Sequence, residues 1–512
     1  MRAPLALLPV LVAAIGCTSH ISGAGGSDGV GAPTVPTQPA LMRPASGAAD
    51  PVPSESSKAP QLVSPAPLAS AQNSGTSDAR RVGATLFFTW IYPKPDTRSL
   101  PLGYLRPGDT LALSDAQPVA GHGCMRFVRV EPKGFICASR AGTLDTGNAY
   151  FRAARFVEPA PGAFPYEYAL SMGTHMFTRI PTSEEYAAFK NGRRDRPLRG
   201  WEETHDDLAL EEPISADGPV PYFLEKGGGI PSPWGKGRGL YLKRVPRGVM
   251  LAYSRAFEAN GQVWVLASNL SIVPAQGIKR YRRTNFHGLA LGDGLNLPIA
   301  WVRSGEPNKW RIEGERLVPT SERWPLRSAI PLGAGVREEQ GARWLETRET
   351  GVFVKEREVT VARRRKPPRA LTERDEKWVY AQLGAGLLTL YRGETPVFVT
   401  LASPGVENAT PAGFERVESK HHVSTLTTEN GEPKKFWIAD APWVVYFKRP
   451  FAIHSAFWHE EFGMPRSYGC LNVSPQDGQT IFDFVDPPLP PGWGSAQGDT
   501  RLGRGTWILI ER

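Results

Sequence analysis

Turn-forming residues interrupt this chain often. Glycine and proline number 53 and 48, about a fifth of the 512 residues. Proline removes a backbone donor and glycine weakens the interior of helices and strands, so this content favours loop-rich β domains over a helical enzyme. Runs such as GATLFFTWIY (83–92) and MRFVRV (125–130) are rich in β-branched and aromatic residues, which favours strands. We therefore expect a mainly β protein with roughly two to four domains, since one core rarely serves so long a chain.

The first residues, 1–17, predict export. Arg2 precedes an apolar run over residues 4–15, which is too short to span a bilayer and is typical of a signal peptide. The end of this segment resembles the bacterial lipoprotein box, in which the cysteine, here Cys17, is lipidated and becomes the new N-terminus. A plain secretory signal with a chance cysteine is the alternative. By the same resemblance, Thr18 implies the outer membrane, so we expect a protein of the cell envelope or periplasm that is anchored through lipid.

Composition divides the next part of the chain into three regions. Residues 18–80 are rich in Pro, Ser and Ala. They bury too little apolar surface to become ordered, so they predict a disordered tether. Residues 81–145 predict short strands separated by Gly, Pro and Asp turns, in an order that resembles bacterial SH3-like modules. Residues 146–240 contain one helix-like run and a glycine-rich loop, and this region stays unassigned.

The second half of the chain is also β-rich. Within residues 241–370, the stretches 248–274 and 333–362 each contain a hairpin with a tryptophan in its second strand. They are either repeated SH3-like units or hairpins of one larger domain. From 375 to 512, alternating strands lead to one predicted helix at 474–485, where Ser-Pro matches a cap and a first helical residue. We expect this last region to be a β-rich catalytic domain.

The four cysteines fit an oxidising compartment. If Cys17 carries lipid, Cys124 and Cys137 are a plausible disulfide pair, because the turn at 132–134 brings the two strands that carry them together. Cys470 then has no predicted disulfide partner within the chain. An odd cysteine in an exported protein is either intermolecular or a reactive thiol.

The stretch IHSAFWHEEFGMPRSYGCLNVSP (453–475) carries the chemically informative residues. His454 ends an apolar strand, and Cys470 lies sixteen residues later, next to Gly469. Acyl transfer by a thiol needs a base to form the thiolate and backbone N–H groups aimed at the developing oxyanion. His454 offers the base, the helix that starts near Ser474 favours a thiolate, and Gly469 lets the backbone bend tightly. The alternative is a buried cysteine and an unrelated histidine.

These residues resemble the signature of the L,D-transpeptidases of peptidoglycan, the YkuD-like family. The family has a His, a loop, and then Ser or Thr, His, Gly, Cys, an apolar residue and Asn or Arg. The matching residues in this chain are His454, Ser467, Gly469, Cys470, Leu471 and Asn472. The likeness covers about residues 375 to 512.

The resemblance implies a role for each residue. Cys470 attacks a carbonyl of a peptidoglycan stem peptide and forms a thioester, which an amine resolves. His454 acts as base, and Ser455 orients it through its backbone carbonyl. The oxyanion and substrate-binding residues lie in the loop around the thiol and just after it: Tyr468, Gly469, Ser467 and Asn472, with the N–H of Cys470 as a further donor.

One position departs from the family, because Tyr468 stands where the family has His. His459 lies in the same loop and offers a replacement imidazole, but a solvated loop histidine is the simpler interpretation. His421 and His422 are adjacent without a Cys or carboxylate at ligand spacing, so we expect no metal and no cofactor. The net charge of +9 suits an anionic partner or a solvated basic surface, and we expect no nucleic-acid partner.

The sequence therefore predicts a cysteine acyltransferase that cross-links or remodels the cell wall. Its predicted partners are peptidoglycan stem peptides and, through lipid, a membrane. A hydrolase on the same site and a non-catalytic peptidoglycan-binding lipoprotein remain alternatives. We expect the whole chemical site to lie within residues 375–512, with the earlier modules only positioning it.

Overall fold

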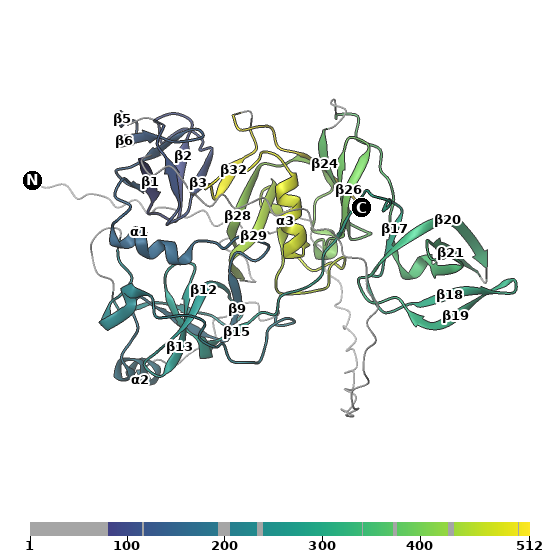
Figure 1. The fold of residues 1–512 in the computed structure, drawn as a ribbon, viewed down its shortest axis with the longest axis horizontal. Helices are drawn as coiled ribbons and strands as arrows, with labels where there is room; N and C mark the ends of the chain where they lie inside the picture. The colour runs from purple at the N-terminus through teal and green to yellow at the C-terminus, as the bar shows by residue number, and fades with distance from the viewer. Residues whose placement is uncertain are drawn as a thin grey trace, which may run out of the picture. The chain divides into compact units, whose positions relative to one another are not determined.

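The computed structural model describes residues 80–114, 117–192, 205–232, 239–339, 341–371, 376–428, 435–499 and 501–512. The predicted signal peptide, Cys17 and the tether up to residue 79 lie outside this part. The described chain is mainly β, as predicted (Figure 1). None of its helices is both long and apolar enough to cross a membrane.

Module 1, which we define as residues 81–143, is a set of short antiparallel strands. They are β1 (Arg81–Ala84), β2 (Thr89–Tyr92), β3 (Gly103–Leu105), β4 (Thr110–Ala112), β5 (Val119–Gly121), β6 (Cys124–Arg129), β7 (Phe135–Cys137) and β8 (Gly142–Thr143). Val82, Ile91 and Ile136 lie fully buried in its core. A disulfide joins Cys124 to Cys137, with 5.9 Å between their Cα atoms, across the turn between β6 and β7.

Module 2 covers residues 167–280. Its strands are β9 (Glu167–Ser171), β10 (Thr174–Phe177), β11 (Tyr241–Val245), β12 (Met250–Ala259), β13 (Gln262–Ala267), β14 (Ile272–Pro274) and β15 (Ile278–Arg280). The helices around it are α1 (Ala149–Ala154), η1 (Arg155–Val157), α2 (Ser183–Gly192), η2 (Tyr222–Gly227) and η3 (Ala275–Gly277). Helix α2 contains most of the helix-like run that the sequence predicts in residues 146–240.

Module 3 covers residues 299–362. Its elements are β17 (Ile299–Trp301), β18 (Asn308–Glu313), β19 (Arg316–Arg323), β20 (Ala329–Glu339), β21 (Ala342–Thr347), β22 (Val352–Lys355), η4 (Glu356–Glu358) and β23 (Thr360–Ala362).

The three modules share one antiparallel pairing scheme. In each, the first strand pairs with the fourth and the last, and the second strand pairs with the third and the penultimate. In modules 2 and 3 the buried tryptophans, Trp264 and Trp344, each donate the indole N–H to a backbone carbonyl five residues earlier, both at 3.1 Å. The stretches 248–274 and 333–362 lie in modules that share this pairing scheme, and module 2 begins earlier than the sequence suggests. Their SH3-like character remains a prediction.

The C-terminal domain has two sheets with a helix between them. One sheet contains β16 (Leu289–Ala290), β24 (Lys377–Gln382), β25 (Leu387–Arg392), β26 (Thr395–Leu401), β27 (Gly413–Arg416) and β33 (Trp507–Glu511). The other contains β28 (Ser419–Thr427), β29 (Trp437–Lys448), β30 (Phe451–Ser455), β31 (Leu471–Val473) and β32 (Ser495–Gln497). The remaining helices are η5 (Val406–Asn408) and α3 (Pro475–Phe484). Apolar residues of both sheets and of α3 form one core, which includes Val379, Ile453 and Ile481.

Helix α3 forms where the sequence predicts it. The side chain of Ser474 accepts a hydrogen bond from the backbone N–H of Asp477, at 3.2 Å, and Pro475 occupies the first helical position. Ile481 and Phe482 are buried in the shared core.

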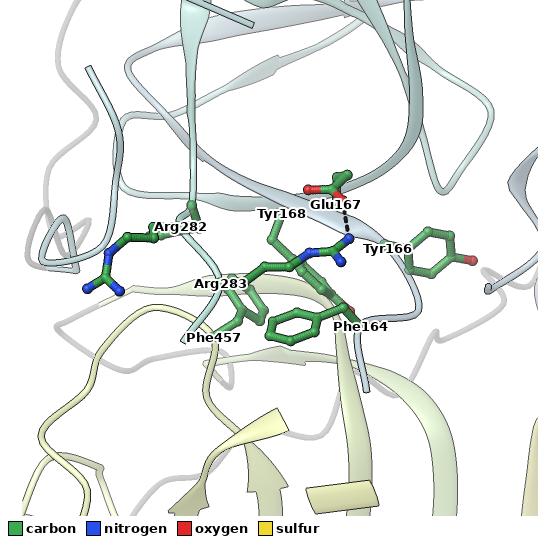
Figure 2. Close-up of a pocket in the computed structure, with 8 residues that line it drawn as sticks. Phe164, Tyr166, Glu167, Tyr168, Arg282, Arg283 and Phe457 are labelled. Atoms are coloured by element: carbon green, nitrogen blue, oxygen red, sulfur yellow. Dashed lines mark hydrogen bonds and ion pairs between the residues drawn. The ribbon is translucent and has the colours of Figure 1, made fainter. Parts of the chain in front are cut away.

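Modules 1 and 2 continue the second sheet of the C-terminal domain. Strand β3 pairs with β32, and Met250 of β12 pairs with Ile438 of β29. Tyr168 of module 2 stacks on Phe457, with 3.9 Å between ring centroids, beside a cavity of about 10 Å³ (Figure 2). That space is about the size of one water molecule, so this junction is packed and holds no substrate-sized site.

Candidate active site

Two neighbouring parallel strands bring the predicted nucleophile and base together. Strand β30 pairs with β31 so that His454 lies opposite Asn472. Side chains alternate along a strand, so Cys470 shares a face with Asn472 and, across the pair, with His454. Leu471 belongs to the core that packs against α3 on the opposite face. The motif therefore places its chemical residues on one face and its apolar residue on the other.

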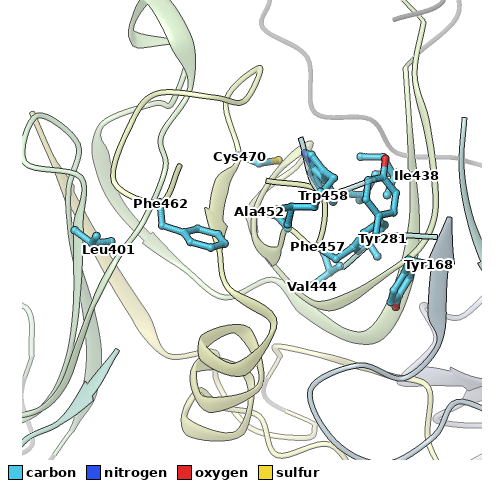
Figure 3. Close-up of a cluster of buried hydrophobic side chains, with 14 of the residues drawn as sticks. Tyr168, Tyr281, Leu401, Ile438, Val444, Ala452, Phe457, Trp458, Phe462 and Cys470 are labelled. Atoms are coloured by element: carbon cyan, nitrogen blue, oxygen red, sulfur yellow. The ribbon is translucent and has the colours of Figure 1, made fainter. Parts of the chain in front are cut away.

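That face forms part of a cavity with about 50 Å³ of space. Its lining combines the predicted site with apolar and polar side chains from several elements: His205, Gly248, Met250, Leu426, Phe436, Ile438, His454, Trp458, Arg466, Ser467, Tyr468, Cys470 and Asn472. Figure 3 shows Cys470 beside Trp458 in the buried cluster that also includes Ala452 and Phe457. Such walls limit water at the sulfur, which favours acyl transfer to a bound nucleophile.

His454 is held as a neutral imidazole. Its Nδ1 lies 3.1 Å from the backbone carbonyl oxygen of Ser455. A carbonyl can only accept, so Nδ1 carries the hydrogen and Nε2 keeps a lone pair. Burial lowers the pKa of His454 to about 4, and the bond to Ser455 opposes this shift. The imidazole is therefore available as a base at neutral pH, and Ser455 contacts it through its backbone.

Cys470 is fully buried. Its sulfur is disulfide-bonded in the structure, and no cysteine among the described residues is free. The expectation that Cys470 has a free thiol is therefore wrong for this state. A sulfur within a disulfide cannot act as the nucleophile, so the chemistry below is that of the reduced thiol.

The turn before Cys470 is fixed by Ser467. The Ser467 hydroxyl donates to the carbonyl oxygen of Cys470 at 2.5 Å and accepts from the N–H of Gly469 at 3.1 Å. The N–H of Gly469, which the sequence predicts as an oxyanion donor, therefore has the Ser467 hydroxyl as its partner in this structure. Gly469 is nevertheless required: its φ is +134°, and a Cβ atom would lie 2.4 Å from the ring of Phe451.

The ring of Tyr468, at the position where the family has His, lies parallel to that of Phe436, with 6.2 Å between centroids. Both residues line the cavity. The structure therefore places an aromatic wall at this position.

His459 differs from its expected role. It is fully buried, with its Nε2 atom 3.2 Å from Nδ2 of Asn472, so the interpretation as a solvated loop histidine is wrong. Burial lowers its pKa well below the usual value, and the nearby Arg466 acts in the same direction. The apolar neighbours of His459 in the sequence, Phe457, Trp458 and Phe462, are the signal that this loop packs inward.

Module 2 supplies part of the site that the sequence did not reveal. Gly248, Met250 and His205 line the cavity but lie outside residues 375–512. Asp207 also forms an ion pair with the lining residue Arg466. The expectation that residues 375–512 contain the whole site is therefore wrong, because module 2 forms one wall of the cavity. The pairing of β12 with β29 brings this wall next to the catalytic domain.

Of the adjacent histidines His421 and His422, the first has a hydroxyl group close to each of its ring nitrogens. His421 is buried, with Nδ1 3.1 Å from the Tyr104 hydroxyl and Nε2 3.0 Å from the Ser419 hydroxyl. Within the described ranges, no three His, Cys, Asp or Glu side chains are grouped to hold a metal ion.

Comparison with protein families gives one match at this site. Residues 376–510 match the YkuD family, described as the L,D-transpeptidase catalytic domain. The residues that line the cavity from β28 to β31 all lie within this segment. This segment is therefore similar to the catalytic domain of the L,D-transpeptidases.

The solved structures that the comparison finds include L,D-transpeptidases from three bacteria. The one from Stackebrandtia nassauensis is 17% identical, with a TM-score of 0.20, and the match covers 29% of this chain and 58% of that one. One from Mycobacterium smegmatis is 17% identical, with a TM-score of 0.22, over 40% of this chain and 78% of that one. The catalytic domain from E. faecium is 19% identical, with a TM-score of 0.21, and the match covers 27% of this chain and 97% of that one. No curated protein sequence matches the chain.

Proposed function

We propose that this protein is a peptidoglycan L,D-transpeptidase with Cys470 as nucleophile and His454 as base. One observation carries the proposal: the two residues line one cavity from neighbouring strands, within the segment that matches the catalytic domain. The lowered pKa of His454 supports it, because a neutral imidazole can accept the thiol proton.

The reaction begins with transfer of the Cys470 thiol proton to Nε2 of His454. The thiolate attacks the carbonyl of the donor stem peptide, and the peptide C–N bond breaks while the imidazolium returns the proton to the leaving amine. An acceptor amine then attacks the thioester, the C–S bond breaks, and the thiol is regenerated. Cell-wall cross-linking or remodelling is the result.

An envelope location fits this substrate. The predicted signal peptide and the lipoprotein-like segment ending at Cys17 support an exported protein held at a membrane by lipid, most simply at the outer membrane. The +9 net charge suits an anionic wall polymer. The predicted tether over residues 18–80 gives the enzyme reach from its anchor.

Product analysis tests the proposal. The reduced protein is incubated with tetrapeptide-bearing muropeptides and an amine acceptor, and the products are weighed by mass spectrometry. A transpeptidase yields donor joined to acceptor with loss of the terminal donor residue, and Cys470→Ala yields none. Products formed with water alone identify a hydrolase. No product from the wild type, together with product from Tyr468→His, identifies a wall-binding relative that has lost catalysis.

A further inference from the structure

Arg466 is the one permanently charged side chain among the described residues that line the cavity, and the mechanism does not use it. Its side chain is 29% exposed, whereas Cys470 is fully buried. The guanidinium therefore lies nearer to solvent than the thiol does, on the wall of the same cavity. A cation in this place favours an anionic group on the molecule that enters.

Backbone contacts fix the position of Arg466. Its N–H donates to the carbonyl of Pro404 at 2.9 Å, and the carbonyl of the next residue, Ser467, accepts from the N–H of Val406 at 2.9 Å. These bonds tie the residue to the segment that follows β26. The arginine is thus held four residues before the nucleophile, in the same turn-bearing loop.

Two carboxylates orient the guanidinium, and neither belongs to the cavity lining. Nη2 of Arg466 pairs with Asp207, and Nη1 lies 3.1 Å from a carboxylate oxygen of Glu461. The side chains of Asp207 and Glu461 are 43% and 55% exposed, and ion pairs this exposed contribute little to stability. A guanidinium has five N–H donors, so these pairs leave donors for a third carboxylate.

Module 2 anchors the segment that carries Asp207. The carbonyl of the buried Leu208 accepts from the N–H of Arg282 at 2.7 Å. The hydroxyl of Tyr281 donates to the carbonyl of His205 at 2.8 Å. The partner of Arg466 is therefore fixed as firmly as Arg466 itself.

The proposed donor carries a carboxylate close to the reacting bond. A tetrapeptide ends in a free carboxylate, one residue after the carbonyl that the thiolate attacks. One residue spans about 3.5 Å, so a cation on the wall of the cavity that holds the thiol is within reach of this group.

We propose that Arg466 binds a carboxylate of the reacting peptide and so selects substrates that carry one. The inference rests on the proposed acyl transfer and adds to it a specificity-determining contact. The carboxylate has two possible sources, namely the terminal residue of the donor or the residue that bears the attacking amine of the acceptor.

The test compares substrates that differ only in this group, using the full-length reduced protein. The donor is a tetrapeptide ending in a carboxylate or in a carboxamide, and the acceptor is an amino acid or its amide. Intrinsic differences in reactivity between the two forms are the same for every variant, so they cancel in the ratio of rates. Alkylation of Cys470 by the neutral reagent iodoacetamide reports thiol reactivity alone.

Three variants are compared with the wild type. Arg466→Gln removes the charge and keeps a polar side chain, while Arg466→Lys keeps the charge without the planar fork. Arg282→Gln is the matched control, because Arg282 pairs with Glu460 at 3.1 Å and does not line the cavity.

We expect Arg466→Gln to lose about tenfold or more with the carboxylate substrate and to change by less than about twofold with the carboxamide, as for one lost charge-assisted hydrogen bond. Arg466→Lys should recover part of the loss, and Arg282→Gln should behave as the wild type. A loss in kcat/KM for thioester formation assigns the carboxylate to the donor. A loss in the partition of the thioester between amine and water assigns it to the acceptor.

The wild type gives a second measurement that does not depend on any variant. Its preference for the carboxylate over the carboxamide should fall as salt is raised, because ions screen a partly exposed arginine. A preference that is absent at low salt would overturn the inference even if Arg466→Gln failed to fold.

Other results also overturn it. Equal losses of Arg466→Gln with both substrate forms, together with slower alkylation, would show that the arginine only supports the structure. A wild-type thioester with unchanged carboxylate preference in Arg466→Gln would contradict the inference alone. If the wild type alkylates normally but forms no thioester with either donor, the proposed function fails and this inference fails with it.

Discussion

Arg106 of module 1 and Asp440 of β29 form a buried two-pronged ion pair. The guanidinium nitrogens lie 3.0 and 2.9 Å from the two carboxylate oxygens, and the side chains are 4% and 2% exposed. The backbone carbonyl of Asp440 also accepts from the hydroxyl of Tyr168 in module 2, at 3.0 Å. One residue of β29 thus joins both modules to the strand that carries Ile438 of the cavity wall.

Breaking this pair should destabilise the protein strongly. Arg106→Ala leaves a buried carboxylate without its partner, and we expect a loss of about 3–5 kcal/mol in the free energy of unfolding. Arg98→Ala, which breaks the exposed pair with Asp96, is the control and should lose far less stability than Arg106→Ala. Denaturant unfolding of the wild type and both variants measures the loss in the free energy of unfolding for each. Equal losses would contradict the role given to the buried pair.

Removal of modules 1 and 2, together with β16 and the first three strands of module 3, should damage the site. A chain that begins at residue 330 lacks Arg106 and Met250, so it loses the ion pair and one wall of the cavity. We expect it to form no thioester with a peptide donor, while a chain that begins at residue 80 reacts normally. Mass spectrometry of both chains after incubation with the donor is the measurement. Equal thioester formation would show that residues 330–512 suffice.

The pH dependence of acylation should reflect the low pKa of His454. Burial holds this pKa at about 4, below the usual 6.5, so the base is lost only as the pH falls toward 4. We expect the acid limb of kcat/KM for acylation to be centred near pH 4, with little change between pH 6 and 7. Stopped-flow acylation rates from pH 3.5 to 8 measure it. An acid limb centred at 6.5 would contradict the buried neutral imidazole.

Asp477 should make stability depend on pH. It is 1% exposed, and burial raises its pKa from 3.8 to about 6. Hydrogen bonds with the Gly288 N–H, the Thr400 hydroxyl and Ser474 lower the pKa but do not cancel the effect of burial. The folded state therefore favours the protonated acid. Its contribution to stability is complete below pH 3.8 and is lost as the pH rises through 6, about 3 kcal/mol in all.

Asp477→Asn does not titrate and keeps an acceptor for the Gly288 N–H. We expect its stability relative to wild type to rise by about 2 kcal/mol from pH 4 to pH 7.5, measured by denaturant unfolding at both values. A difference that stays constant over this range would show that the carboxyl is not buried as described.

Local sequence signals predicted local structure well. The Ser474 cap and the following Pro475 predicted the start of α3, and the turn between Cys124 and Cys137 predicted the close approach of their strands. These features depend on residues within a few positions of each other. The three modules were harder to predict, because β9 pairs with β12 and β15 across long insertions that no local pattern reveals.

The candidate site likewise has features that the sequence predicted and features that it could not predict. The spacing of His454 and Cys470 was readable because strand alternation and a short loop define it. The wall from Met250 and the burial of His459 depend on packing between distant segments. The occupied N–H of Gly469 depends on the rotamer of Ser467, which sequence does not specify.

Capture of a carbapenem by the reduced full-length protein tests the central claim most directly. The strained amide carbonyl of the drug resembles the transferred acyl group, so a nucleophilic thiol opens the ring and keeps the drug. We expect intact-mass and peptide mass spectrometry to show one carbapenem on Cys470, none on Cys470→Ala, and a rate roughly 10²–10⁴ lower for His454→Ala. Absence of an adduct on both the wild type and Tyr468→His, with the thiol shown to be reduced, would contradict the assignment of Cys470 as the nucleophile.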